Sequence, residues 1–182
     1  FARALINSGE TGYAVEELEH RLGQAPDSLK VREQLAIAYF CDNRRLEAQR
    51  VAGEILEKQP GDVLANCTMA LAELDAGDRA AAESRLERIA RPLPDSPEEL
   101  HSIAVLQLDL ARFGEAEQTL LRLMQALPYD ENVLHKLGYA RFMQDDAEGA
   151  KAYYRRLLAI DPHDTVARYY LGQCNRPEAS RK

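Results

Sequence analysis

Five prolines recur at intervals of 34 residues along the 182-residue chain, at Pro26, Pro60, Pro94, Pro128 and Pro162. Each proline closes a stretch whose apolar residues follow helical spacing, as in "LLAIDP" at 157–162. A helix often ends before a proline, because proline lacks an amide hydrogen and disfavours helical geometry in the residue before it. A fixed period over most of the chain predicts a repeat architecture, in which each unit buries its apolar surface against its neighbours.

Other residue types recur in the same register. Counting each repeat from 31 residues before its proline gives full units at 29–62, 63–96, 97–130 and 131–164. Small residues at the eighth and twentieth positions let two helices approach closely, and a serine or aspartate at the last position can cap the next helix. The recurring residues are Phe1, Leu35, Met69, Ile103, Leu137 and Leu171 at position 7; Ala2, Ala36, Ala70, Ala104, Gly138 and Gly172 at position 8; Ala14, Ala48, Ala82, Ala116 and Ala150 at position 20; and Ser28, Asp62, Ser96, Asp130 and Asp164 at the last position.

Each unit has the pattern of two helices joined by a short turn. In unit 131–164, "NVLHKLGYARFMQ" has helical spacing, "DD" interrupts it and "AEGAKAYYRRLLAI" resumes it. An additional proline, Pro92, follows the second helix of unit 63–96, so we expect that helix to end early. Stacking of such helix pairs predicts an all-α fold, a right-handed α-solenoid of helix-turn-helix units with a 34-residue period.

The spacing, the small residues at positions 8 and 20 and the proline at position 32 resemble the tetratricopeptide repeat (TPR) family. Unit 131–164 is the most similar, with "LGYA" at 137–140, Ala150, Tyr154 and "IDP" at 160–162. The family's tryptophan at position 4 is absent, and its tyrosine at position 11 is kept only as Tyr39. The resemblance implies a single TPR solenoid over 1–174, with a partial unit at 1–28, the four full units, a capping helix at about 165–174 and a flexible tail at 175–182.

In TPR solenoids the first helix of each unit lines a concave groove, toward which positions 2, 5, 9, 12 and 13 point. Carried over to this chain, those positions imply a mainly apolar groove for an extended or helical peptide segment, with aromatic residues gathered toward its C-terminal end. The run of lysines and asparagines with which some TPR domains grip the acidic tail of a chaperone is absent. The expected peptide-binding residues are Ile37, Phe40, Cys67, Leu71, Leu74, His101, Val105, Leu108, His135, Tyr139, Phe142, Met143, Tyr169 and Tyr170.

Cys67, His101 and His135 share position 5 of successive units, and cysteine and histidine are zinc ligands. Three donors in a row along stacked helices would not converge on one tetrahedral ion, so we expect no metal site and no cofactor. The three cysteines lack a C-x-x-C pairing, which argues against a disulfide framework. No phosphate-binding glycine loop or catalytic motif occurs, and we expect that the segment is not an enzyme.

The formal net charge of −7 disfavours nucleic acid and anionic membranes as partners, because both attract clustered lysine and arginine. The cysteine usage favours a reducing compartment and hence a cytoplasmic location, and the absence of methionine at position 1 suggests a segment of a longer protein. The sequence therefore predicts a non-catalytic protein-interaction scaffold whose partner is an unidentified protein or peptide. Two alternatives remain open: a regulatory or substrate-recruiting portion of a multidomain enzyme, or a module that self-associates as a homodimer through an uncapped end.

Overall fold

The computed structural model describes residues 5–6 and 9–176, so the expectations for Phe1, Ala2 and residues 177–182 of the tail lie outside the described residues. The chain divides into two compact units, Phe1–Pro92 (unit 1) and Leu93–Lys182 (unit 2), and each is described by itself. The expectation of one solenoid over 1–174 stays a prediction. Throughout the described part of the chain the regular structure is helical, which confirms the all-α fold class.

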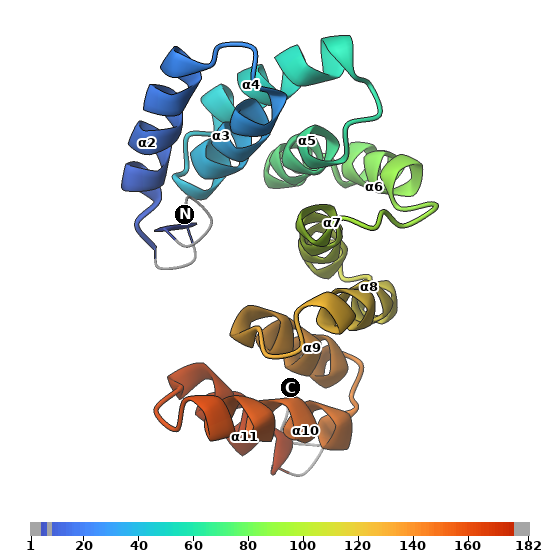
Figure 1. Cartoon of the computed structure of the whole chain (residues 1–182). Coiled ribbons are helices and arrows are strands. Elements are labelled where there is room, and N and C mark those ends of the chain that lie inside the picture. Colours follow the sequence, from blue (N-terminus) through green and yellow to red (C-terminus); the bar gives the residue numbers. More distant parts are fainter. Residues whose placement is uncertain (1–4, 7–8, 177–182) are drawn as a thin grey trace. The chain divides into compact units, whose positions relative to one another are not determined.

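In each unit the helices pack in chain order, each against the next (Figure 1). Unit 1 contains α2 (Thr11–Gln24), α3 (Leu29–Cys41), α4 (Arg45–Lys58), α5 (Val63–Asp75) and α6 (Arg79–Ile89). Unit 2 contains α7 (Pro97–Asp109), α8 (Phe113–Ala126), α9 (Glu131–Met143), α10 (Ala147–Ile160) and α11 (Thr165–Cys174). We call α3, α5, α7, α9 and α11 the first helices and α2, α4, α6, α8 and α10 the second helices. The first helices begin 34 residues apart, and α3 also packs on α5 and α9 on α11, which confirms the repeat period.

The predicted caps begin all five first helices. The side chain of Ser28, Asp62, Ser96, Asp130 or Asp164 accepts a hydrogen bond from the backbone N–H three residues later. The donor–acceptor distances are 3.4, 2.8, 3.5, 3.0 and 2.8 Å in that order. Each cap satisfies an amide that has no partner within the helix and stabilises the helix by about 1 kcal/mol.

The small residues predicted at positions 8 and 20 lie where the two helices of a 34-residue repeat meet. Within the four full repeats, 29–62 to 131–164, every one of these small residues is buried, and Ala48, Ala82, Ala116 and Ala150 have no exposed surface. The helices are close together at Gly138, because a Cβ placed there would lie 2.7 Å from Cζ of Tyr154 on α10. Helix α6 ends at Ile89 after 11 residues, whereas α4 has 14, which confirms the early end expected from Pro92.

The turn between the two helices of a repeat contains a residue with positive φ, which the sequence pattern did not indicate. The residue at position 15 has positive φ in each described turn: 83° at Gly9, 61° at Asn43, 86° at Gly77, 56° at Ala111 and 60° at Asp145. The amide of the following residue then bonds a carbonyl five residues back, as Asp146 N does to Arg141 O at 3.0 Å. This is the geometry of a left-handed helix C-cap, in which glycine, asparagine and aspartate are the residues least strained.

Among the described residues, no helix combines the length and apolar character needed to cross a bilayer.

Candidate functional site

The expected groove residues of unit 1 lie on α3 and α5 and are mostly half-buried. Ile37, Leu71 and Leu74 are half-buried, whereas Cys67 is only 2% exposed. Cζ of Arg45 lies 3.7 Å from the ring centroid of Phe40, and Arg45 Nε donates to Asp75 Oδ2 at 2.6 Å. Because the Arg45 guanidinium covers one face of the Phe40 ring, that face makes a cation–π contact within unit 1.

The expected residues of unit 2 lie on α7, α9 and α11 and include the more exposed members of the set. Met143 is 41% exposed and Tyr169 is 60% exposed. The remaining ones are half-buried, namely His101, Val105, Leu108, His135, Tyr139, Phe142 and Tyr170. The two most exposed side chains of the expected set, Met143 and Tyr169, therefore both lie on first helices of unit 2.

Six tyrosine and phenylalanine residues of unit 2 form one connected group, which we call the aromatic cluster, and the ring of His135 lies beside it, 6.5 Å from the ring of Tyr154. Tyr170 is its centre, with ring centroids 5.3 Å from Phe142 and from Tyr169 and 6.0 Å from Tyr139, all edge-on. The ring of Tyr154 is stacked on Tyr170 at 5.3 Å with an interplanar angle of 6°. Edge-to-face and stacked pairs at these distances add to the energy of simple burial. The members of the cluster are Phe113, Tyr139, Phe142, Tyr154, Tyr169 and Tyr170.

The cluster is anchored at its base by Tyr154, which is fully buried on α10. Burial raises the pKa of the Tyr154 hydroxyl far above its usual value, and the neighbouring Tyr170, Cys174 and Tyr139 raise it further. The hydroxyl has no hydrogen-bond partner among the described residues. Burial also raises the pKa of Tyr170, together with Tyr139 and Tyr169. The hydroxyls of Tyr154 and Tyr170 therefore stay neutral at physiological pH.

His135, expected to face the groove, makes a hydrogen bond that ties α9 to α11. Its Nε2 lies 2.6 Å from Oδ2 of Asp164, the residue that caps α11. Burial of Asp164 favours its neutral form, but the hydrogen bond from Ala167 N–H and the contact with His135 outweigh that effect and lower the pKa of the carboxyl. Asp164 is therefore a charged cap that also fixes the His135 ring, which positions α11 beside α9.

A second polar group, below the turn between α9 and α10, holds that turn in place. Arg141 pairs with the buried carboxylate of Glu117 on α8, and its Nη1 lies 2.6 Å from Oδ2 of Asp146. Gln144 Nε2 donates to Glu117 Oε2 at 2.9 Å. Hydrogen bonds from Gly149 N–H and from Arg141 lower the pKa of Asp146. These charge-assisted bonds connect α8, α9 and the start of α10.

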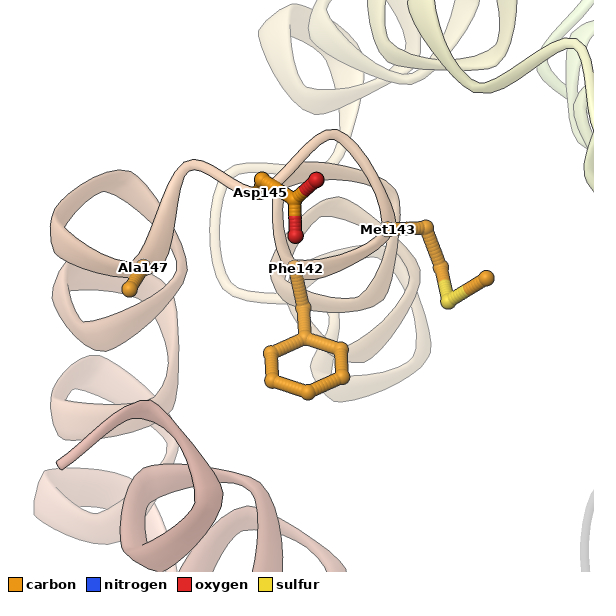
Figure 2. Close-up of a pocket in the computed structure, with 4 residues that line it drawn as sticks. All are labelled: Phe142, Met143, Asp145 and Ala147. Atoms are coloured by element: carbon orange, nitrogen blue, oxygen red, sulfur yellow. The ribbon is translucent and has the colours of Figure 1, made fainter. Parts of the chain in front are cut away.

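A small hollow opens beside this turn, at the edge of the aromatic cluster. It has a volume of about 150 Å³ and is lined by Phe142 and Met143 from the last turn of α9, Asp145 from the turn and Ala147 from the start of α10 (Figure 2). A larger hollow of about 310 Å³ lies in unit 1 between α2, α3 and α4, lined among others by Leu22, Tyr39 and Val51. Within the part of the chain that the structure describes, no three His, Cys, Asp or Glu residues are placed to hold a metal ion.

The structure brings together four of the residues that the sequence singled out, Tyr139, Phe142, Tyr169 and Tyr170, in one cluster. Phe113 and Tyr154 complete the cluster, but they lie on the second helices α8 and α10 and so were not among the predicted groove residues. Asp145 was not among the predicted site residues either, because "DD" at 145–146 has the pattern of a turn. The expectation that these residues bind a peptide stays a prediction.

The helix-turn-helix units with a 34-residue period and small residues at the helix contacts define the fold of TPR proteins. Solved structures agree. The thermophilic TPR protein TTC0263 of Thermus thermophilus aligns over 95% of this chain and 94% of its own, with a TM-score of 0.70 and 17% identity. YrrB, described as a TPR protein with an unusual peptide-binding site, aligns over 93% of this chain and 87% of its own (TM-score 0.58, 14% identity). A TPR protein from Parabacteroides merdae aligns over 95% and 69% (TM-score 0.59, 14% identity). No protein-family model matches the sequence, and no curated protein does.

Proposed function

We propose that this chain is a non-catalytic scaffold for protein interaction, and that the first helices bind an extended or helical peptide segment in a mainly apolar groove. The observation that carries the proposal is the part of the aromatic cluster that lies on α9 and α11, where Tyr169 is 60% exposed, together with the exposed Met143 next to Phe142 in the chain. Contiguous exposed apolar surface on a folded protein marks an interaction site more often than isolated apolar residues do. YrrB, which shares the fold, is described as having a peptide-binding site, in agreement with this proposal.

Aromatic side chains suit this role for two physical reasons. A tyrosine offers a large contact area with little side-chain entropy to lose, and its hydroxyl can hydrogen-bond the backbone of a peptide. The cluster is also rigid, because Tyr170 is held between Tyr154 and the rings of Phe142 and Tyr139. A surface that is ordered before binding loses less entropy when the peptide docks. The residues proposed to contact the peptide most directly in unit 2 are therefore Tyr139, Phe142, Met143 and Tyr169.

A selection from a displayed library of random peptides, carried out against the full chain, tests this proposal. Recovered peptides are synthesised with a fluorophore and titrated by fluorescence anisotropy against the chain and two variants. Tyr169→Ala should weaken binding about tenfold or more, as truncation of an exposed aromatic anchor commonly does. Tyr129→Ala is the matched control, because Tyr129 is 80% exposed in the same unit but lies outside the aromatic cluster. The proposal fails if no peptide is enriched, or if both variants bind as tightly as the parent chain.

A further inference from the structure

The hollow beside the α9–α10 turn combines apolar walls with a single charged group. Phe142 and Met143 supply a ring and a thioether, Ala147 supplies a methyl group, and Asp145 supplies a carboxylate (Figure 2). The ring of Phe142 also contacts Tyr170 at 5.3 Å, so the hollow adjoins the aromatic cluster. A volume of about 150 Å³ accommodates a side chain rather than a whole ligand.

The carboxylate at this turn is particular to this repeat. The turn needs a residue that tolerates positive φ, and the other described turns use Gly9, Asn43, Gly77 and Ala111 at the same position. All of those side chains are uncharged, so the backbone geometry does not require a carboxylate. Asp145 therefore adds a negative charge to the hollow that the repeat architecture does not call for.

The charged residues near the hollow do not compensate the negative charge of the Asp145 carboxylate. Asp146 and Glu117 both pair with Arg141, and Asp164 is bonded to His135. Asp145 itself is exposed and forms no ion pair with any residue in the described part of the chain. A carboxylate next to an aromatic ring and a flexible thioether complements a cationic side chain that has a long aliphatic stem.

We infer that this hollow is a subsite for a lysine or arginine side chain, and that the peptide which occupies the groove of unit 2 is basic. The inference rests on the proposed function, since the peptide backbone must lie along the aromatic cluster to bring the side chain to the hollow. The aliphatic stem packs on Phe142 and Met143, and the cationic head pairs with the Asp145 carboxylate. The net charge of −7 of the whole chain also attracts a basic partner.

Blocked amino acids test the subsite before any peptide ligand has been identified. Uniformly ¹⁵N-labelled full chain is titrated at low ionic strength with N-acetyl-lysine methylamide and N-acetyl-arginine methylamide. N-acetyl-norleucine methylamide, which keeps the stem without the charge, and N-acetyl-glutamate methylamide are the comparison probes. The two basic probes should give saturable amide shifts at residues 142–147, and the norleucine probe should bind at least about threefold more weakly.

Two variants separate the role of Asp145 from a change in net charge. Asp145→Asn keeps a residue that tolerates positive φ, and it should raise the dissociation constant of the basic probes about three- to fivefold. Asp27→Asn makes the same charge change at an exposed turn of unit 1 and should leave it unchanged. Equal binding of norleucine and lysine probes, an unaffected Asp145→Asn variant, or no shifts at 142–147 would overturn the inference. Failure of the proposed function is seen separately, in the library selection, because that selection makes no assumption about charge.

Discussion

Replacing Gly138 with alanine perturbs the close contact between α9 and the Tyr154 ring on α10. A Cβ at this position would lie 2.7, 2.8 and 3.1 Å from Cζ, Cε1 and Cε2 of Tyr154. Ordinary carbon–carbon contacts are about 3.5–4.0 Å, so the ring would have to move by several tenths of an ångström. The Tyr154 ring has no free space to do so, because it is fully buried and stacked on Tyr170.

The size of the effect follows from two opposing contributions. Overpacking of a well-packed core costs about 1–3 kcal/mol, whereas alanine is favoured over glycine inside a helix by about 1 kcal/mol. Gly138→Ala should therefore reduce the free energy of unfolding by up to about 2 kcal/mol. Gly53→Ala is the matched control, because Gly53 lies inside α4 and a Cβ there would meet nothing within 4 Å. That variant should instead raise the free energy of unfolding by about 1 kcal/mol.

Urea titration of the full chain, followed by circular dichroism at a helical wavelength, measures both changes. The thermal midpoint should fall by up to about 8 °C for Gly138→Ala. Adding Tyr154→Leu to Gly138→Ala removes the ring atoms that clash, so the two substitutions together should cost less than the sum of their separate effects. If Gly138→Ala is as stabilising as Gly53→Ala, the close approach of α9 to the Tyr154 ring is wrong.

Three further predictions follow from single contacts. Ala111→Gly should raise the free energy of unfolding by about 0.5–1 kcal/mol in the same titration. Glycine removes the strain of an alanine with positive φ, and this gain exceeds the cost of the added freedom of the unfolded chain. A loss of stability would contradict the turn geometry. Tyr154→Phe should leave the free energy of unfolding unchanged or raise it by up to about 1 kcal/mol, because it removes a buried hydroxyl that has no hydrogen-bond partner among the described residues. Tyr39→Phe removes a hydrogen bond to the Glu19 carboxylate (2.6 Å) and should lower it, and the reverse order of the two variants would show that the Tyr154 hydroxyl is hydrogen-bonded. Because the pKa of Asp164 is lower in the folded chain, its stabilising effect is present above the unfolded value of about 4 and is lost as the pH falls through the folded value. Asp164→Asn, which keeps a capping side chain, should flatten the acid limb of a stability–pH profile, and an unchanged limb would rule out that contribution.

The backbone plan of this chain could be predicted from its sequence because local rules determine it. The prolines, the small residues and the caps Ser28, Asp62, Ser96, Asp130 and Asp164 each act within a few residues of their own position. Their 34-residue recurrence predicts where each of the first helices α3, α5, α7, α9 and α11 begins, one residue after its cap. The early end of α6 was predictable for the same reason, since Pro92 acts on the residues immediately before it.

The candidate site could be predicted only in part. Tyr139, Phe142, Tyr169 and Tyr170 lie at groove positions and do meet, but the cluster is completed by Tyr154, which reaches them from a second helix. Contacts between helices depend on rotamers and on how deep each ring is buried, and spacing along one helix reports neither.

Other parts of the site had no recognisable signal in the sequence. The left-handed turn position is occupied by glycine, asparagine, alanine and aspartate, so no single residue type marks it. Asp145 consequently resembled ordinary turn sequence. The Arg45 guanidinium, which lies over the Phe40 ring, also donates a hydrogen bond to Asp75, which is 30 residues further along the chain.

The most direct test of peptide binding at the aromatic cluster is a map of backbone amide shifts. The ¹⁵N-labelled full chain is titrated with a peptide recovered from the library selection, and the shifted residues are assigned. We expect shifts on α9 and α11, centred on Tyr139, Phe142 and Tyr169. Shifts confined to the second helices α8 and α10 would contradict it.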